Sequence, residues 1–298
     1  MKLGFISGIL GNAPINEVID IAHTLDYECV ELSSWLRGSG CSHFDIDLLN
    51  KTEIEKINTY CKAKNITISA LSYYPNYLEH DYKKRVTYIE HLEKLMDLAP
   101  LIGTNTISTF IGRNPHDSVE ESLELYQAIW SPIIKKAEQS NIQISIENCP
   151  MYMVRDNWPG GRNLAMSPQI WNEMFRLIPS ENLGITYDPS HLLALQMDYI
   201  KPLYNFKSKI HHIHLKDAKL DFGVTRDIGS MDYPIEYLRP KLPGLGQINW
   251  GKFISALYDI GYDHSVCVEL KDNTILKSDE DNLKALKFSR HYFSKYIS

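Results

Sequence analysis

The stretch Gln143–Asn148, QISIEN, carries the pattern on which the fold prediction rests. Its apolar and β-branched residues are typical of a buried strand, which ends in two polar residues, Glu147 and Asn148. The same pattern returns three times further along the chain. The matching predicted strands are Leu183–Tyr187, which is followed by DPSH, Ile210–Leu215, which is followed by KD, and Val266–Leu270, which contains Glu269.

Short strands of this kind alternate with longer amphipathic segments over the whole chain. Strict alternation of strands and helices predicts parallel strands that are joined by right-handed crossovers. Eight such units in 298 residues fit a closed barrel, for which about 250 residues is typical. We therefore predict an α/β fold, a (β/α)8 TIM barrel, as a single domain over residues 1–298. The four strands towards the N-terminus are predicted at Leu3–Ser7, Cys29–Ser33, Ile66–Ser72 and Thr104–Phe110.

The alternative fold is an open doubly wound sheet, which places a glycine-rich phosphate-binding turn after its first strand. The residues there are Gly8-Ile9-Leu10-Gly11-Asn12, which do not match GxGxxG followed by a helix. Two long segments interrupt the alternation, Cys149–Met166 and Lys219–Asn249. Segments of this length inside a compact domain are usually functional loops.

Capping residues and prolines predict where the helices begin and end. Thr52 with Glu55, and Ser118 with Glu121, have the spacing of a capping box. Pro132 lies inside a predicted helix and is expected to kink it or to split it in two. The predicted helices begin near Pro14 and after Pro189, and elsewhere cover Thr52–Lys64, His80–Leu98, Ser118–Ser140, Ser167–Ile178, Trp250–Ile260 and Asp279–Tyr296.

Composition narrows the possible functions. The 31 Lys and Arg residues against 37 Asp and Glu residues give a net charge of −6, which argues against a nucleic-acid partner. No apolar run approaches the ~20 residues that span a bilayer, so we expect no membrane partner. The five cysteines form no CxxC pair, and the N-terminal MKLGFISG lacks the apolar core of a secretory signal. We therefore expect a cytoplasmic protein with reduced thiols.

Four consecutive predicted strands offer metal-binding side chains at their carboxyl ends. In a parallel barrel these ends gather at one mouth, where functional residues lie. Buried carboxylates are unfavourable unless they are paired or bound to a metal. Three carboxylates and one imidazole suit one divalent metal ion, with Mn²⁺ expected first and Mg²⁺, Co²⁺, Zn²⁺ or Fe²⁺ as alternatives. The four residues are Glu147, Asp188, His214 and Glu269.

Each of these residues also has a structural interpretation when it is taken alone. Glu147 or Glu269 could cap a helix or pair with a lysine, and Asp188 followed by proline could simply begin a helix. Lys216 and Asp217 could form a solvated ion pair, or Lys216 could contact a substrate. Trp35 and Trp158 could be packed aromatic residues or walls of a sugar pocket. Gly244-Leu245-Gly246 could form a tight turn, or its backbone could approach a ligand.

Several motifs together resemble one family. IEN at Glu147, YDPSH ending at His191, HIHLKD from His212 and VEL around Glu269 resemble the xylose-isomerase-like barrel superfamily, in particular its sugar isomerase and epimerase branch. PGLGQINW at Pro243–Trp250 resembles the PGxGxIDW segment that is common there, with asparagine in place of aspartate. The resemblance covers essentially the whole chain.

The resemblance implies a role for each matched residue. It implies one divalent metal on Glu147, Asp188, His214 and Glu269, with the two glutamates also acting as acid–base groups, and it implies that His191 binds substrate. An arginine that binds substrate in some ketose 3-epimerases of the family would fall on Leu220, so the substrate contact of those enzymes is in doubt here. Lys216 is the candidate replacement. The resemblance also implies a homo-dimer or a homo-tetramer.

The expected activity is isomerisation or epimerisation of a sugar, sugar phosphate or keto-polyol, by proton abstraction next to a metal-chelated carbonyl through an enediolate. The alternative is a metal-dependent lyase or dehydratase that acts on a 3-oxo-glycoside or a keto-inositol. A sugar-binding barrel without catalysis is a further possibility. The superfamily's apurinic-site endonucleases need additional histidines, which the segments Ser69–Ser72, Ser108–Phe110 and Asp227–Gly229 lack.

Overall fold

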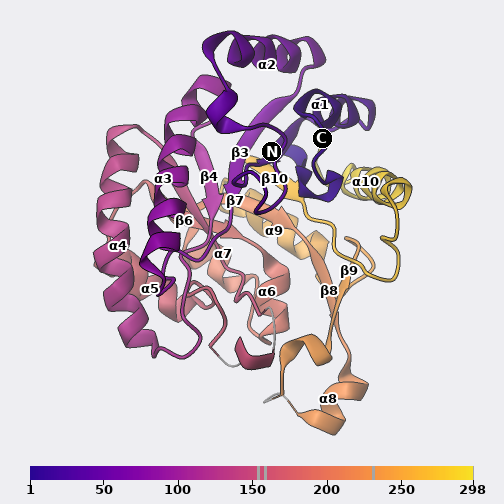
Figure 1. Ribbon diagram of the computed structural model, residues 1–298. Coiled ribbons are helices and arrows are strands. Elements are labelled where there is room, and N and C mark those ends of the chain that lie inside the picture. Colours follow the sequence, from indigo (N-terminus) through magenta and orange to yellow (C-terminus); the bar gives the residue numbers. More distant parts are fainter. Residues whose placement is uncertain (153–154, 158–159, 230–231, 298) are drawn as a thin grey trace.

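The computed structural model describes residues 1–152, 155–157, 160–229 and 232–297, and it confirms the predicted (β/α)8 barrel (Figure 1). The barrel is closed, in the order β1-β10-β7-β6-β5-β4-β3-β2, and its neighbouring strands pair in parallel. Its strands are β1 (Lys2–Ile6), β2 (Cys29–Ser33), β3 (Thr67–Tyr73), β4 (Thr106–Thr109), β5 (Gln143–Glu147), β6 (Leu183–Tyr187), β7 (Ile210–Leu215) and β10 (Ser265–Val268).

Helices surround the barrel and bury their apolar faces against its outer surface (Figure 1). The large side chains Trp130, Trp171 and Trp250 are fully buried in this layer, so the main core lies between barrel and helices. The helices are α1 (Ile15–Thr24), α2 (Lys51–Lys64), α3 (Tyr82–Leu98), α4 (Val119–Gln139), α5 (Pro168–Leu177), α6 (Pro189–Ala194), α7 (Lys201–Asn205), α9 (Trp250–Asp259) and α10 (Asp279–Phe293).

Of the expectations about the helices, one is confirmed, one is wrong, and one of the two alternatives for Pro132 is excluded. The capping box of Ser118 and Glu121 is present at the start of α4. Thr52 is not a cap, because α2 begins one residue earlier and the side chain of Asn50 accepts the backbone N–H of Glu53. Pro132 does not split its helix, since α4 runs through it while burying residues on both sides of the proline.

The segment predicted as one long loop after β7 is a small hairpin. Strands β8 (Asp217–Leu220) and β9 (Leu238–Lys241) pair antiparallel, and α8 (Phe222–Ile228) lies between them. This hairpin projects from the barrel (Figure 1). Arg155, in the loop after β5, forms ion pairs with Asp232 and Glu236, so the two inserted segments contact each other. None of the helices in the described ranges combines the length and apolarity that a bilayer crossing requires.

Candidate metal centre

The four side chains that the sequence singled out meet at the carboxyl ends of four neighbouring strands. Glu147 ends β5, Asp188 follows β6, His214 lies near the end of β7 and Glu269 follows β10. One donor atom from each residue lies within 4.8 Å of the others. Glu147, Asp188 and His214 are buried, and Glu269 is partly exposed. Parallel strands in register place the residues after each strand at one level of the barrel, which explains why this set converges.

Asp188 fits both of the interpretations drawn from the sequence. Its Oδ1 caps α6 by accepting the backbone N–H of Ser190 at 2.7 Å, and Pro189 is the first residue of that helix. Its Oδ2 faces the other ligand candidates, and the nearest cationic nitrogen to it is His191 Nε2 at 3.1 Å. The side chain of Asn148 fixes the position of Asp188, because it bonds both the N–H and the C=O of that residue, at 2.7 and 3.0 Å.

His214 supplies the observation that best fits a metal. Its Nδ1 is fully buried and has no hydrogen-bond partner among the described residues. Glu147 Oε1 and Glu269 Oε2 each lie 3.6 Å from this nitrogen, too far for a hydrogen bond. A buried nitrogen that faces two carboxylates without bonding either is the arrangement expected where all three bind one cation. The residues present therefore fit a divalent metal ion.

Two cationic side chains border this group. Lys216 Nζ lies 2.6 Å from Glu269 Oε1 and 3.7 Å from Asp188 Oδ2. His191 Nε2 lies 3.2 Å from Glu147 Oε1 and 3.1 Å from Asp188 Oδ2. Both side chains are buried, so the carboxylates are compensated by charge and hydrogen bonding rather than by water.

Burial and charge together determine which of these groups are ionised. Burial raises the pKa of Glu147, but the neighbouring histidines, His191 first among them, outweigh it, so the net pKa is well below the ordinary value. The pKa of Asp188 is lowered in the same way, with burial opposed by His191 and Lys216. Burial lowers the pKa of Lys216, but Glu269 and Asp188 raise it above its ordinary value overall. The site therefore holds ionised carboxylates beside a cationic ammonium group.

A cavity of about 350 Å³ lies over these residues. Trp35, Tyr74 and Phe110 line one part of it, while Lys216 and Lys271 contribute charge. Trp35 is half-buried and its ring packs edge-on against Tyr73, so it is both a packed aromatic residue and a wall of the cavity. Trp158, the second predicted wall, lies outside the described residues. Aromatic walls around a few polar groups suit a small polar molecule such as a sugar.

Asp217 is not the partner of Lys216, so the predicted solvated ion pair is wrong. Successive residues of an extended chain point to opposite sides, which directs Lys216 into the cavity and Asp217 away from it. Asp217 is fully buried and holds the PGLGQINW segment. Its carboxylate accepts the backbone N–H groups of Gly244, Gly246 and Ile248 and the indole N–H of Trp250. A Cβ at Gly246 would overlap Asp217 Oδ1, so the backbone there approaches this carboxylate rather than a ligand.

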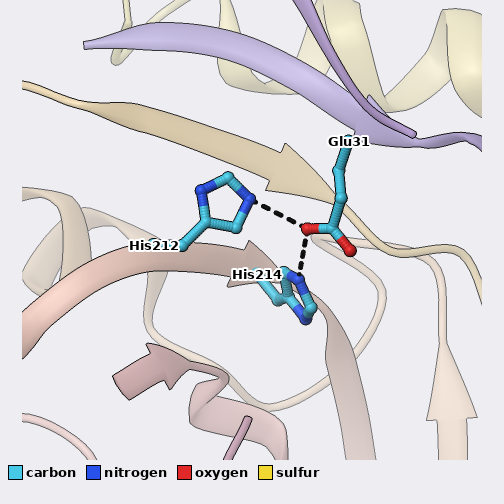
Figure 2. Close-up of side chains that lie close together, drawn as sticks. All are labelled: Glu31, His212 and His214. Atoms are coloured by element: carbon cyan, nitrogen blue, oxygen red, sulfur yellow. Dashed lines mark hydrogen bonds and ion pairs between the residues drawn. The ribbon is translucent and has the colours of Figure 1, made fainter. Parts of the chain in front are cut away.

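Sequence reasoning missed Glu31 and His212, which lie inside the barrel against His214. Figure 2 shows the carboxylate of Glu31 between the two imidazoles. Glu31 Oε2 lies 2.8 Å from His214 Nε2 and 2.9 Å from His212 Nε2, and the side chains are buried. The signal in the sequence was a single glutamate within the apolar strand CVELS, since a charge inside a buried strand requires a partner.

Comparisons with known proteins agree with the barrel fold. The family model described as xylose isomerase-like TIM barrel matches residues 19–292. The chain belongs to this family. A relative in Bacillus subtilis (strain 168), the uncharacterized protein YfiH, is 26% identical over 92% of this chain and 94% of its own length. The resemblance stated from the sequence motifs is therefore confirmed at the level of the family.

Solved structures share the fold at low sequence identity. The IolI protein, solved with a bound zinc atom, has a TM-score of 0.75 at 20% identity, with all of both chains covered. A D-psicose 3-epimerase, solved in the presence of D-fructose, has a TM-score of 0.74 at 13% identity over 100% of this chain and 99% of its own. AsbF of Bacillus anthracis, a probable 3-DHS dehydratase, has a TM-score of 0.72 at 18% identity over 99% of each chain.

Proposed function

We propose that the protein is a divalent-metal-dependent isomerase or epimerase of a sugar, sugar phosphate or keto-polyol, with Mn²⁺ as the preferred ion. The observation that carries this proposal is the unpartnered Nδ1 of His214, which faces Glu147 and Glu269 inside a buried, carboxylate-rich site. Glu147, Asp188, His214 and Glu269 would hold the metal. The names of the similar structures, a sugar epimerase and a zinc-containing protein among them, support the same choice.

The two glutamates are the proposed acid–base pair. When bound, a divalent cation supplies a Lewis acid that polarises the carbonyl of the substrate. One glutamate takes the proton from the adjacent C–H bond, and the electron pair moves to the carbonyl oxygen to give an enediolate. The other glutamate returns a proton. Return to the same carbon on its other face gives an epimer. Return to the former carbonyl carbon, together with transfer of the proton of the adjacent hydroxyl to the former carbonyl oxygen, gives an aldose–ketose isomer.

Neighbouring side chains prepare both glutamates for these steps. His191 contacts Glu147, and Lys216 donates to Glu269 at 2.6 Å, so each carboxylate is oriented by a fixed donor. His191 and Lys216 are also the proposed substrate-binding residues, since Lys216 lines the cavity and His191 lies beside Glu147 at its base. Trp35 would contribute an apolar face for the sugar ring, and Trp158 stays a sequence-based prediction.

Solvent hydrogen exchange tests the proposal directly. Purified protein is incubated with Mn²⁺, a panel of keto sugars and keto-polyols, and D₂O, and deuterium in the recovered substrate is measured by NMR. We expect one substrate class to gain carbon-bound deuterium with the wild-type protein. In Glu147→Gln the exchange rate should fall by a factor of about 100 or more, which is typical for the loss of a general base. The exposed Glu181→Gln is the matched control and should retain the wild-type rate. Equal exchange by Glu147→Gln and the wild type would refute the assignment.

A metal-dependent lyase or dehydratase is the second candidate, and Lys216 is the observation that favours it. Its buried ammonium group lies beside Glu269 and lines the cavity, where its positive charge would stabilise the negative charge on the oxygen of a departing hydroxyl or aglycone. The same incubation distinguishes the two candidates. Elimination yields an unsaturated product and free water or aglycone, whereas isomerisation and epimerisation yield only a rearranged sugar.

A further inference from the structure

Glu31 lies on the far side of His214 from the candidate metal centre. It is fully buried on β2, and His214 Nε2 is 2.8 Å from its Oε2 (Figure 2). The opposite ring nitrogen, Nδ1, faces Glu147 and Glu269. Glu31 is not among the residues that would hold the metal, and its role rests on the metal centre proposed above.

This contact determines which nitrogen of His214 carries the proton. An ionised carboxylate only accepts hydrogen bonds, so Nε2 of His214 must be the N–H donor. A neutral imidazole has one N–H, and its other nitrogen then holds a free lone pair. The lone pair is thereby directed from Nδ1 towards the two glutamates of the centre. A carboxylate behind a ligating histidine fixes the tautomer and the ring orientation, and it makes the histidine a stronger ligand.

Glu31 is itself held in place by two further side chains, His212 and Tyr74. His212 Nε2 lies 2.9 Å from the same oxygen that His214 contacts. The hydroxyl of Tyr74 donates to the other oxygen, Oε1, at 2.8 Å, and this hydroxyl lies 2.9 Å from Ser108 Oγ. Tyr74 also lines the cavity over the metal centre. His212 on β7 and Tyr74 after β3, with Ser108 on β4 behind Tyr74, therefore fix the carboxylate of Glu31 against the imidazole of His214.

We propose that Glu31 is a positioning residue of the metal centre, which holds His214 in the Nε2–H tautomer so that Nδ1 binds the cation. A purely structural role for Glu31 would predict a loss of stability without a specific effect on metal binding. The two roles are separable, because metal affinity and histidine tautomer can be measured on the folded protein without any substrate.

The first test is a Co²⁺ titration of metal-free Glu31→Gln, followed by the visible absorbance of the bound ion. Glutamine keeps the shape and one acceptor atom but removes the charge, so it isolates the electrostatic part of the contact. We expect the dissociation constant for Co²⁺ to rise by about 10–100-fold, the usual effect of removing such a partner. Ser145→Ala is the matched control, because Ser145 is equally buried in the barrel and bonds Thr186 instead of His214. It should bind Co²⁺ within about twofold of the wild type.

The second test determines the tautomer of His214. Long-range ¹H–¹⁵N NMR spectra of histidine-labelled protein with Zn²⁺ should show one zinc-bound imidazole, bound through Nδ1 and protonated at Nε2, in the wild type. In Glu31→Gln we expect this signal to broaden or to be joined by the other tautomer. Should Glu31→Gln not fold, Tyr74→Phe replaces it in both tests, since it removes the donor to Glu31 Oε1. A smaller rise in the dissociation constant, above that of Ser145→Ala, is then expected.

The outcomes separate this inference from the proposed function. A wild-type protein that binds no Co²⁺ would remove the metal centre, and the role of Glu31 with it. Normal binding by the wild type with unchanged affinity and unchanged tautomer in the variant would overturn only the role of Glu31. Equal weakening in Glu31→Gln and Ser145→Ala would also overturn it, because a general loosening of the barrel would then explain both.

Discussion

Asp217→Asn is expected to destabilise the protein strongly, although it only replaces one carboxylate oxygen with an NH₂ group. The carboxylate of Asp217 is fully buried and joins β8 to the PGLGQINW segment. Its Oδ2 accepts the backbone N–H groups of Gly244 and Gly246 and the indole N–H of Trp250, at 2.9, 3.2 and 2.9 Å. Its Oδ1 accepts from Ala218 and Ile248, at 2.8 and 3.1 Å.

The size of the effect follows from counting these donors. The NH₂ group of asparagine must replace one of the two oxygens, and each oxygen accepts at least two N–H groups. Whichever way the amide turns, at least two buried or partly buried donors then face another donor. A buried donor without a partner costs about 1–3 kcal/mol, so we expect a loss of about 2–6 kcal/mol in the free energy of unfolding.

Urea unfolding at pH 7, followed by tryptophan fluorescence and circular dichroism, measures this loss. Asp198→Asn is the matched control, because Asp198 also accepts two backbone N–H groups but lies exposed at the start of α7. Asparagine keeps the Oδ1 that accepts both N–H groups, so this exposed substitution should stay within about 0.5 kcal/mol of the wild type. A loss below about 1 kcal/mol in Asp217→Asn would show that its carboxylate does not hold the segment as described.

Two further substitutions test the electrostatics of buried groups. Burial lowers the pKa of His211 to about 4, whereas a histidine in the unfolded chain has a pKa of about 6.5. As pH falls from 6.5 towards 4, the unfolded chain therefore binds a proton that the folded protein does not, and this group should lower the free energy of unfolding by about 2 kcal/mol between pH 7 and pH 5. In His211→Leu, the decrease in the free energy of unfolding between pH 7 and pH 5 should be smaller than in the wild type by about 2 kcal/mol, whereas the exposed His116→Leu should show the wild-type decrease. The same pH dependence in both variants would contradict the argument. Lys216→Met leaves Glu269 without its buried cation, so the metal-free protein should lose about 3 kcal/mol in urea unfolding and regain part of it with Mn²⁺. The exposed Lys284→Met should change stability by less than about 1 kcal/mol, and an equal loss in both variants would refute the role given to Lys216.

The boundaries of the strands were largely readable from the sequence, and those of the helices less so. Cys29–Ser33, Gln143–Glu147, Leu183–Tyr187 and Ile210–Leu215 are strands with the predicted bounds, because short apolar runs between polar residues have few other ways to be buried. The hairpin β8–β9 was not predicted. Its strands are short and antiparallel, and their partners are known only once the chain has folded back.

The sequence by itself determined the barrel and the four residues that converge at its mouth. Alternation of strands and helices forces parallel strands, and parallel strands bring their carboxyl ends together, so Glu147, Asp188, His214 and Glu269 could be grouped without coordinates. The tertiary structure alone decided which groups surround them. Glu31 and His214 are 183 residues apart in the chain and are brought into contact only when the barrel closes. The partner of Lys216 was decided in the same way, since the nearest acid in sequence points to the other side of the strand.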